Sequence, residues 1–196
     1  MKASDHFLNG GKPLDLTIEN FWQYHYANMY NQQEYIAEFL VGTALGETTP
    51  NNDYWRLWDV DYHFGDKTYR IEVKSTSYYH SFQDELYQGR TSEVRTFDIH
   101  KAYEEYQNKK TELRRNSDIY VFCLNVGRTA EESNPIDVSN WEFYLVTREN
   151  LESQLADENQ KSISLSRVRA LAGEKCSYLE IKSKVDSLIP TIKEKR

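Results

Sequence analysis

The residues best suited to chemistry fall in one stretch, WRLWDVDYHFGDKTYRIEVKSTSYY, which spans residues 55–79. Polar and apolar residues alternate on both sides of Gly65-Asp66, a pattern that predicts two antiparallel strands joined by a two-residue turn. That register places Asp59 opposite Glu72. Because side chains alternate between the faces of a strand, we expect one face to carry four charged side chains: Asp59, Asp61, Glu72 and Lys74.

Two facing carboxylates of this kind are typical of a site for a divalent cation. Asp59 and Glu72 would lie about 5 Å apart across the hairpin, and they would repel each other without a cation between them. Mg²⁺ or Mn²⁺ suits such oxygen ligands and can polarise a phosphoryl oxygen. The ammonium of Lys74 could orient a water or balance charge on a phosphate. The pattern therefore predicts hydrolytic phosphoryl transfer.

Two alternatives stay open for this face of the hairpin. Asp61 could replace Asp59 as the metal ligand, although it also falls opposite Arg70, with which it could form a cross-strand pair. Charged residues also cover strand faces for solubility alone, and the chain would then be an interaction module without catalysis. The apolar residues beside Glu72 and Lys74 favour the catalytic interpretation, because they indicate a buried strand in which charges need a reason.

The rest of the pattern predicts an α/β fold, with a small mixed β-sheet flanked by helices. Helical periodicity is clear over residues 32–45, whereas DIYVFCLNV (118–126) has the continuous apolar run of a strand buried on both faces. The other expected elements are a helix from Thr17, a mainly helical stretch over 80–116, a strand over 141–147, and helices over 164–171 and 178–189.

Length and composition predict a single domain without a membrane segment. The 196 residues suit one domain over 17–190, with a loose lead-in over 1–16 and a basic tail over 191–196. No apolar run reaches the roughly 18 residues of a membrane-spanning helix, and the N-terminus lacks a secretory apolar stretch. The two cysteines, Cys123 and Cys176, are expected to be buried free thiols, which favours a cytoplasmic protein. The net charge of −7 argues mildly against nonspecific nucleic-acid binding.

A helix with a glutamate, followed by a hairpin with Asp and Glu-x-Lys, resembles the PD-(D/E)xK superfamily of restriction-endonuclease-like nucleases. The 13 positions from Asp59 to Glu72 are a common gap in that superfamily. The resemblance implies that Glu38, Asp59, Glu72 and Lys74 form the site. It also implies that the Val73 carbonyl adds a ligand for Mg²⁺ or Mn²⁺. DNA would be the substrate, and a homodimer would suit double-strand cleavage.

Longer strings resemble a group of bacterial proteins of unassigned function that look restriction-endonuclease-like. The likeness covers most of residues 20–185 and includes AEFLVGTALG, IEVKSTSYYHSF, SDIYVFCL, NPIDVSNWEFYLV and KSISLSRVRAL. Gln33 and Glu34 stand where typical members have Arg-Gly, and His80 stands in place of a Gln. These departures leave the expected metal-binding residues intact but affect positions that could contact phosphate.

Several further residues are candidates for substrate binding. His80 could be a general base or a phosphate contact, and Ser75 could bond a phosphate or the neighbouring backbone. Arg114 and Arg115 could grip phosphates, although a solvated helix face is an equal alternative. Tyr78, like its neighbour Tyr79, could stack on a base, but core packing is the favoured interpretation.

Overall fold

The computed structural model describes residues 2–25, 33–47, 57–79, 95–106, 109–129 and 131–193. The fold is mixed α/β, and the central element is a four-stranded sheet in the order β3-β4-β8-β9. β4 and β8 are parallel, whereas the outer pairs β3–β4 and β8–β9 are antiparallel, so the sheet is mixed. Its strands are β3 (Val60–Phe64), β4 (Lys67–Ser77), β8 (Ile119–Asn125) and β9 (Trp141–Thr147).

The predicted hairpin register is confirmed. Phe64 pairs with Lys67 across the turn, and Asp61 pairs with Arg70. Gly65 has a φ of 60°, the left-handed conformation that a two-residue hairpin turn requires and that glycine adopts at little cost. The register on the following strands is therefore fixed by a local turn.

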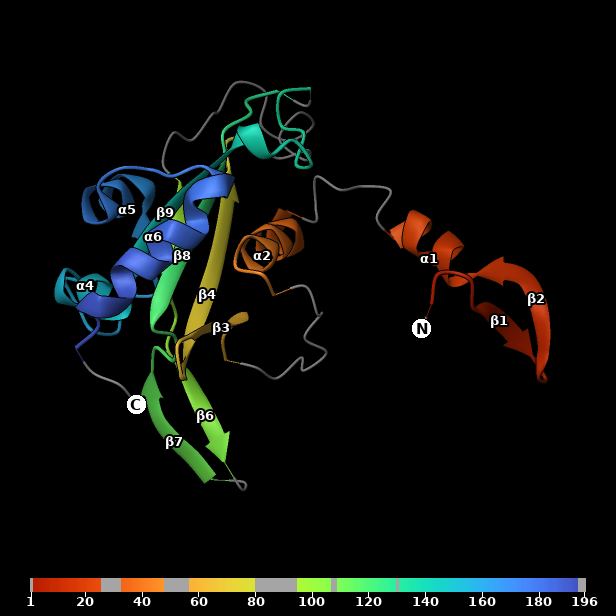
Figure 1. Ribbon diagram of the computed structural model, residues 1–196, viewed down its shortest axis with the longest axis horizontal. Helices are drawn as coiled ribbons and strands as arrows, with labels where there is room; N and C mark the ends of the chain where they lie inside the picture. The colour runs from red at the N-terminus through yellow and green to blue at the C-terminus, as the bar shows by residue number, and fades with distance from the viewer. Residues whose placement is uncertain are drawn as a thin grey trace.

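Helices cover both faces of this sheet (Figure 1). One face packs against α2 and α6, and the other packs against α4, α5 and the short strand pair β5–β10. The helices on these faces are α2 (Gln33–Ala44), α4 (Arg148–Ser153), α5 (Leu165–Ala172) and α6 (Ile181–Leu188), and the strand pair is β5 (Thr96–Asp98) with β10 (Ser162–Ser164).

β8 divides the core into two layers, as its apolar run predicts. Every residue of Ile119–Asn125 is buried. Val121 and Cys123 point toward α2 and α6, whereas Tyr120 and Phe122 point toward α4 and α5. Both cysteines of the chain are free and buried, as expected.

The stretch expected to be mainly helical contains strands instead over its described residues. β5 is followed by β6 (Ala102–Tyr106) and β7 (Lys109–Arg114), which pair with each other in antiparallel register (Figure 1). Phe97 and Ile99 are both fully buried although only two positions separate them. That spacing puts both side chains on one side of an extended chain, which a helix cannot do.

The N-terminal residues form a hairpin and a helix rather than a loose lead-in. β1 (His6–Asn9) pairs with β2 (Lys12–Thr17), and both turn glycines have a positive φ, 56° for Gly10 and 81° for Gly11. α1 (Ile18–His25) follows directly. Thr17 is its N-cap, as predicted, since its hydroxyl oxygen accepts a hydrogen bond from the Asn20 N–H at 3.3 Å.

The C-terminal helices agree with the sequence pattern. α5 begins after Ser164, whose hydroxyl accepts from the Arg167 N–H, and α6 is continued by a 3-10 turn that contains Pro190. Across the described ranges, no helix has the length and apolarity needed to cross a bilayer.

Candidate active site

Asp59 lies just before β3 and reaches across to β4. Its N–H donates to the Ile71 carbonyl at 3.0 Å rather than to Glu72, so the predicted register ends at the Val60–Ile71 pair. Its carboxylate oxygen Oδ2 accepts from the Val73 N–H at 2.6 Å. The N–H and C=O of a strand residue point to the same side of the strand, so the Val73 carbonyl points to the β3 side of β4, where Asp59 lies. The two expected metal ligands, the Asp59 carboxylate and the Val73 carbonyl, therefore lie on the same side of β4.

Glu72 and Lys74 form an ion pair on one face of β4. Lys74 Nζ lies 2.7 Å from Glu72 Oε1, and their side chains are 23% and 16% exposed. The second oxygen of Glu72 accepts from the Ser117 hydroxyl at 2.8 Å. Both carboxylate oxygens are thus bonded inside the protein, in a layer that also contains Tyr120 and Phe122.

Glu38 completes a group of acids that act on one another. Neighbouring α2 residues, Ala37 and Leu40, anchor the helix in the core, and Glu38 itself is half-buried. The pKa of Glu38 is raised to about 7, mainly by burial and further by the negative charges of Asp59 and Glu34. Lys74 acts in the opposite direction.

The pKa of Asp59 is raised to about 6. Burial is the main cause, and the negative charge of Glu72 is the second. The hydrogen bond from the Val73 N–H and the charge of Lys74 both lower it, but they do not cancel the rise. Glu38 and Asp59 therefore both resist ionisation, as carboxyl groups do when they share a partly buried site.

Lys74 stays charged in this setting. Burial pulls its pKa down, but the charge and hydrogen bond of Glu72, with further help from Asp59 and Asp98, outweigh burial and leave the pKa raised. The Lys74 ammonium thus marks a place where the surrounding carboxylates favour a positive charge.

No family model, no curated protein and no solved structure matches this chain. The function must therefore be argued from the geometry of the site.

The donor set has the chemistry that Mg²⁺ or Mn²⁺ prefers, because every candidate ligand is an oxygen. The charges of Asp59, Glu72 and Glu38 affect one another's pKa values, and the Val73 N–H donates to Asp59. Within the described ranges, however, no three acidic, histidine or cysteine side chains converge closely enough to hold a metal ion. The ligand types fit a divalent ion, but the side chains are not arranged around one point.

Asp61, the alternative ligand, is placed in a different cluster. Its Oδ1 accepts from the Trp58 indole N–H at 2.8 Å. The Arg70 guanidinium stacks over the Trp58 ring at 3.9 Å, and Arg70 is the cross-strand neighbour of Asp61. Asp59 therefore contacts the Glu-x-Lys segment, whereas Asp61 contacts the half-buried Trp58 and lies beside Arg70.

The structure corrects the expectation that Arg115 contacts phosphate. Its side chain is only 1% exposed, and the guanidinium donates to the carbonyls of Ile99, Glu158 and Gln160 at 3.0, 3.3 and 2.7 Å. Arg115 thus ties the β5 region to the segment before β10. It does not lie on a helix face, since β7 precedes it.

The other candidates for substrate binding are more scattered. Arg114 Nε donates to Asn116 Oδ1 at 3.1 Å. Ser75 is half-buried and follows Val73 on the face opposite Lys74. His80 lies outside the described residues.

Sequence reasoning missed Ser117, the hydrogen-bond partner of Glu72. Ser117 lies two residues before the start of the buried strand β8, and it reaches Glu72 because β8 runs parallel to β4. The apolar run identified β8 as a buried strand, but nothing local in the sequence specified its partner or direction.

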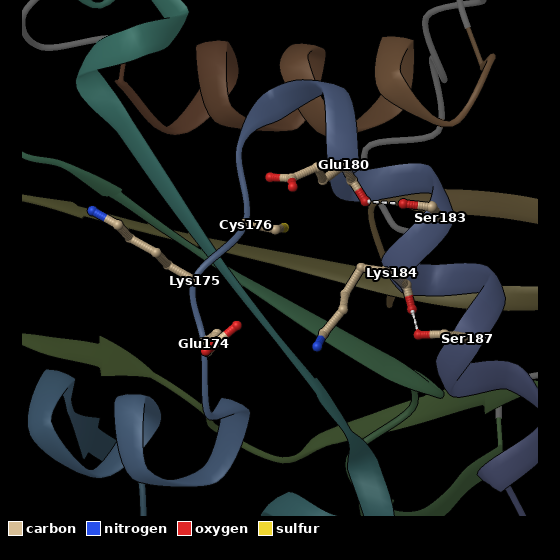
Figure 2. Close-up of a pocket in the computed structure, with 7 residues that line it drawn as sticks. All are labelled: Glu174, Lys175, Cys176, Glu180, Ser183, Lys184 and Ser187. Atoms are coloured by element: carbon tan, nitrogen blue, oxygen red, sulfur yellow. Dashed lines mark hydrogen bonds between the residues drawn. The ribbon is translucent and has the colours of Figure 1, made fainter.

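An open groove of roughly 320 Å³ lies apart from these residues, between α6 and the segment before it (Figure 2). Figure 2 shows that the Ser183 and Ser187 hydroxyls bond to carbonyls of their own helix. Burial and the nearby Glu180 charge raise the pKa of the Cys176 thiol to about 11. The groove offers neither free hydroxyl donors nor a reactive thiolate, and none of the predicted site residues lines it.

Proposed function

We propose that this chain is a metal-dependent phosphodiesterase of the PD-(D/E)xK type, with nucleic acid, and DNA in the first place, as its substrate. The observation that carries the proposal is the bond from the Val73 N–H to the Asp59 carboxylate, beside the Glu72–Lys74 ion pair. It brings the aspartate of the hairpin to the Glu-x-Lys segment. The mixed sheet with a parallel β4–β8 pair is compatible with a restriction-endonuclease-like core.

Asp59, Glu72 and the Val73 carbonyl would hold Mg²⁺ or Mn²⁺, with Glu38 beside them. Such an ion polarises a phosphoryl oxygen and lowers the pKa of bound water. Lys74 would place its ammonium against the negative charge that develops on the phosphate. Glu38 would accept a proton from the attacking water at its carboxylate.

A second candidate is a nucleic-acid-binding module that retains the fold without catalysis. It is favoured by one observation: both oxygens of Glu72 are already bonded, to Lys74 and to Ser117. In that case the ion pair would stabilise the strand rather than take part in a reaction. A homodimer remains a prediction under either function.

The deciding experiment compares cleavage of supercoiled plasmid and of labelled duplex DNA, single-stranded DNA and RNA, with Mg²⁺, Mn²⁺ or EDTA. We expect metal-dependent cleavage that falls by about a hundredfold or more in Lys74→Ala, since the lost charge acts on the transition state. Lys67→Ala is the matched control, because Lys67 is an exposed lysine at the other end of β4. Absence of cleavage by the folded wild-type chain, or equal cleavage by Lys74→Ala, would reject the enzyme.

A further inference from the structure

Two guanidinium groups converge on one aromatic ring at the carboxyl end of β4. The Arg128 Cζ lies 4.5 Å from the centre of the Tyr78 ring, and the Arg95 Cζ lies 5.8 Å from it. Arg95 Nη2 also donates to the Tyr78 carbonyl at 2.6 Å. The ring packs on the core layer beneath it, so Tyr78 holds both cations in place.

This pair of cations is short of negative charge. Neither guanidinium is paired with a carboxylate within the part of the chain that the structure describes, and the Glu132 carboxylate bonds to the Arg128 backbone N–H instead. Arg95 is only 8% exposed, and its Nε has no hydrogen-bond partner among the described residues. A buried donor on a cation without a partner is costly, which points to an anion that completes the site.

The electrostatics of Arg95 agree with this geometry. Burial lowers the pKa of its guanidinium, Tyr78 offsets part of that effect, and the like charge of Arg128 lowers the pKa further. A bound anion would relieve both the burial and the repulsion, because it favours the charged form of each group.

The loop that carries Arg128 is held in place by hydrogen bonds and by a close backbone contact. Asn125, at the end of β8, accepts from the Gly127 N–H through its side chain at 3.1 Å and from the Tyr78 N–H through its backbone carbonyl at 3.2 Å. A Cβ at Gly127 would lie 2.4 Å from backbone atoms of Ser133, so the close approach of these two segments requires glycine. Tyr78 and Gly127, the residue before Arg128, are thus both bonded to Asn125.

The position of the pair relates it to the candidate active site. Tyr78 lies one residue beyond the end of β4 and follows Lys74 by four residues, a distance of about 13 Å in an extended chain. Its ring packs on the core layer that Lys74 also faces. Each strand of DNA carries a phosphate about every 3.4 Å of helix axis, so that interval corresponds to about four nucleotides. A nucleic-acid strand with one phosphate at Lys74 would therefore bring a later phosphate to the arginine pair.

We infer that Arg95 and Arg128, held over Tyr78, bind a backbone phosphate of a nucleic-acid strand that extends from the candidate active site. The inference rests on the proposed function for the identity of the anion, and it assigns to that function a second contact with the substrate. Arg95 supplies a buried donor, and Arg128 supplies an exposed positive charge over the same ring.

The test measures binding of fluorescently labelled duplex and single-stranded DNA by anisotropy, in EDTA so that cleavage does not interfere. Arg128→Gln should weaken binding by about fivefold and reduce the slope of log K against log salt by about one, the signature of one lost phosphate contact. Arg128→Lys should retain most of the affinity. Lys67→Gln, which removes one exposed positive charge at the far end of β4, should bind like the wild type.

Equal affinities and salt slopes for Arg128→Gln and Lys67→Gln would overturn the inference. A wild-type chain that binds neither duplex nor single-stranded DNA would overturn it as well. Its failure is distinguishable from failure of the phosphodiesterase proposal. Binding that depends on Arg128 without cleavage in any metal supports the phosphate site and rejects the enzyme. Cleavage and binding that are unaffected by Arg128→Gln reject only the phosphate site.

Discussion

The two faces of β4 have opposite energetics although they alternate along a single strand. On the face toward α2, Ile71 and Val73 are 0% and 2% exposed and pack in an apolar layer. On the other face, Glu72 and Lys74 are largely enclosed but charged. The first face is stabilised by removal of apolar surface from water, which needs no specific partner. The second is tolerated only because each charge has a partner.

Because of this difference, substitutions on the two faces of β4 should have different effects on stability. A truncation on the apolar face should cost stability wherever it is made, because packing is lost. On the charged face, the cost should depend on which partner remains behind. The residues that would act on a substrate, Glu72 and Lys74, are thus also those whose substitution leaves an enclosed charge without its partner. Such conflicts between function and stability are common at functional sites.

The strongest test of the comparison is Ile71→Ala on the apolar face. We expect the free energy of unfolding to fall by about 2–5 kcal/mol, because a fully buried side chain is truncated and leaves a cavity. Urea denaturation followed by circular dichroism would measure it. Lys67→Ala, at an exposed position of the same strand, should change stability by less than about 0.5 kcal/mol. A similar small change for Ile71→Ala would contradict the burial of this face.

The next test removes one partner on the charged face. Lys74→Met should lower the free energy of unfolding by about 1–3 kcal/mol in EDTA, because the Glu72 carboxylate is left enclosed and without its cation. The double variant Glu72→Gln/Lys74→Met should recover most of that loss. If the single and double variants are equally stable in the same denaturation experiment, the ion pair has no energetic role in the free protein.

The sequence predicted the hairpin and three members of its site because the information is local. Alternation and a glycine turn fix the register from the Val60–Ile71 pair to the Phe64–Lys67 pair, and just beyond it the Asp59 carboxylate accepts from the Val73 N–H, between Glu72 and Lys74. The expectation of helix is wrong for β5, β6 and β7, because few apolar residues mark these strands and the burial of β5 depends on packing against distant segments. The Gly10-Gly11 turn of the N-terminal hairpin was a local signal that the prediction overlooked.

The rest of the site depends on contacts between distant segments. Ser117 reaches Glu72 through the parallel pairing of β4 with β8, and Arg95 reaches Tyr78 from a segment 17 positions away. Nothing in a single sequence specifies such pairings, since each follows from the tertiary arrangement. Arg115 shows the same limit in reverse: a basic residue in a basic cluster proved to be an internal hydrogen-bond donor.

A third test uses pH to examine the acids Glu38 and Asp59. The folded chain holds the pKa of Glu38 at about 7, above the value of 4.5 for a solvated glutamate. Between these values the folded state binds more protons than the unfolded state, so stability is greatest on the acid side and decreases as pH rises through 7. Glu38→Gln should therefore stabilise the chain at pH 8 by about 1–2 kcal/mol, with little effect near pH 4.

The control for this profile is Glu174→Gln, at an exposed position before α6. Its stability should follow that of the wild type from pH 4 to 8, and both should be measured by urea denaturation in EDTA. If Glu38→Gln and Glu174→Gln give the same profile, Glu38 does not share an electrostatic site with Asp59, and the grouping of these two acids is incorrect.

The smallest expected effect is the stabilisation of the charged face by a divalent ion. Saturation with Mg²⁺ or Mn²⁺ at several times its Kd should add about 1 kcal/mol to the free energy of unfolding, which corresponds to a rise of about 2–4 °C in Tm. Asp59→Asn should lose the shift, since it removes a charged ligand beside Val73. Asp61→Asn should keep it, because Asp61 is bonded to Trp58 instead. A shift that is lost in Asp61→Asn and kept in Asp59→Asn would exchange the two aspartates, and a wild-type chain with no shift would mean that Lys74 alone neutralises these acids.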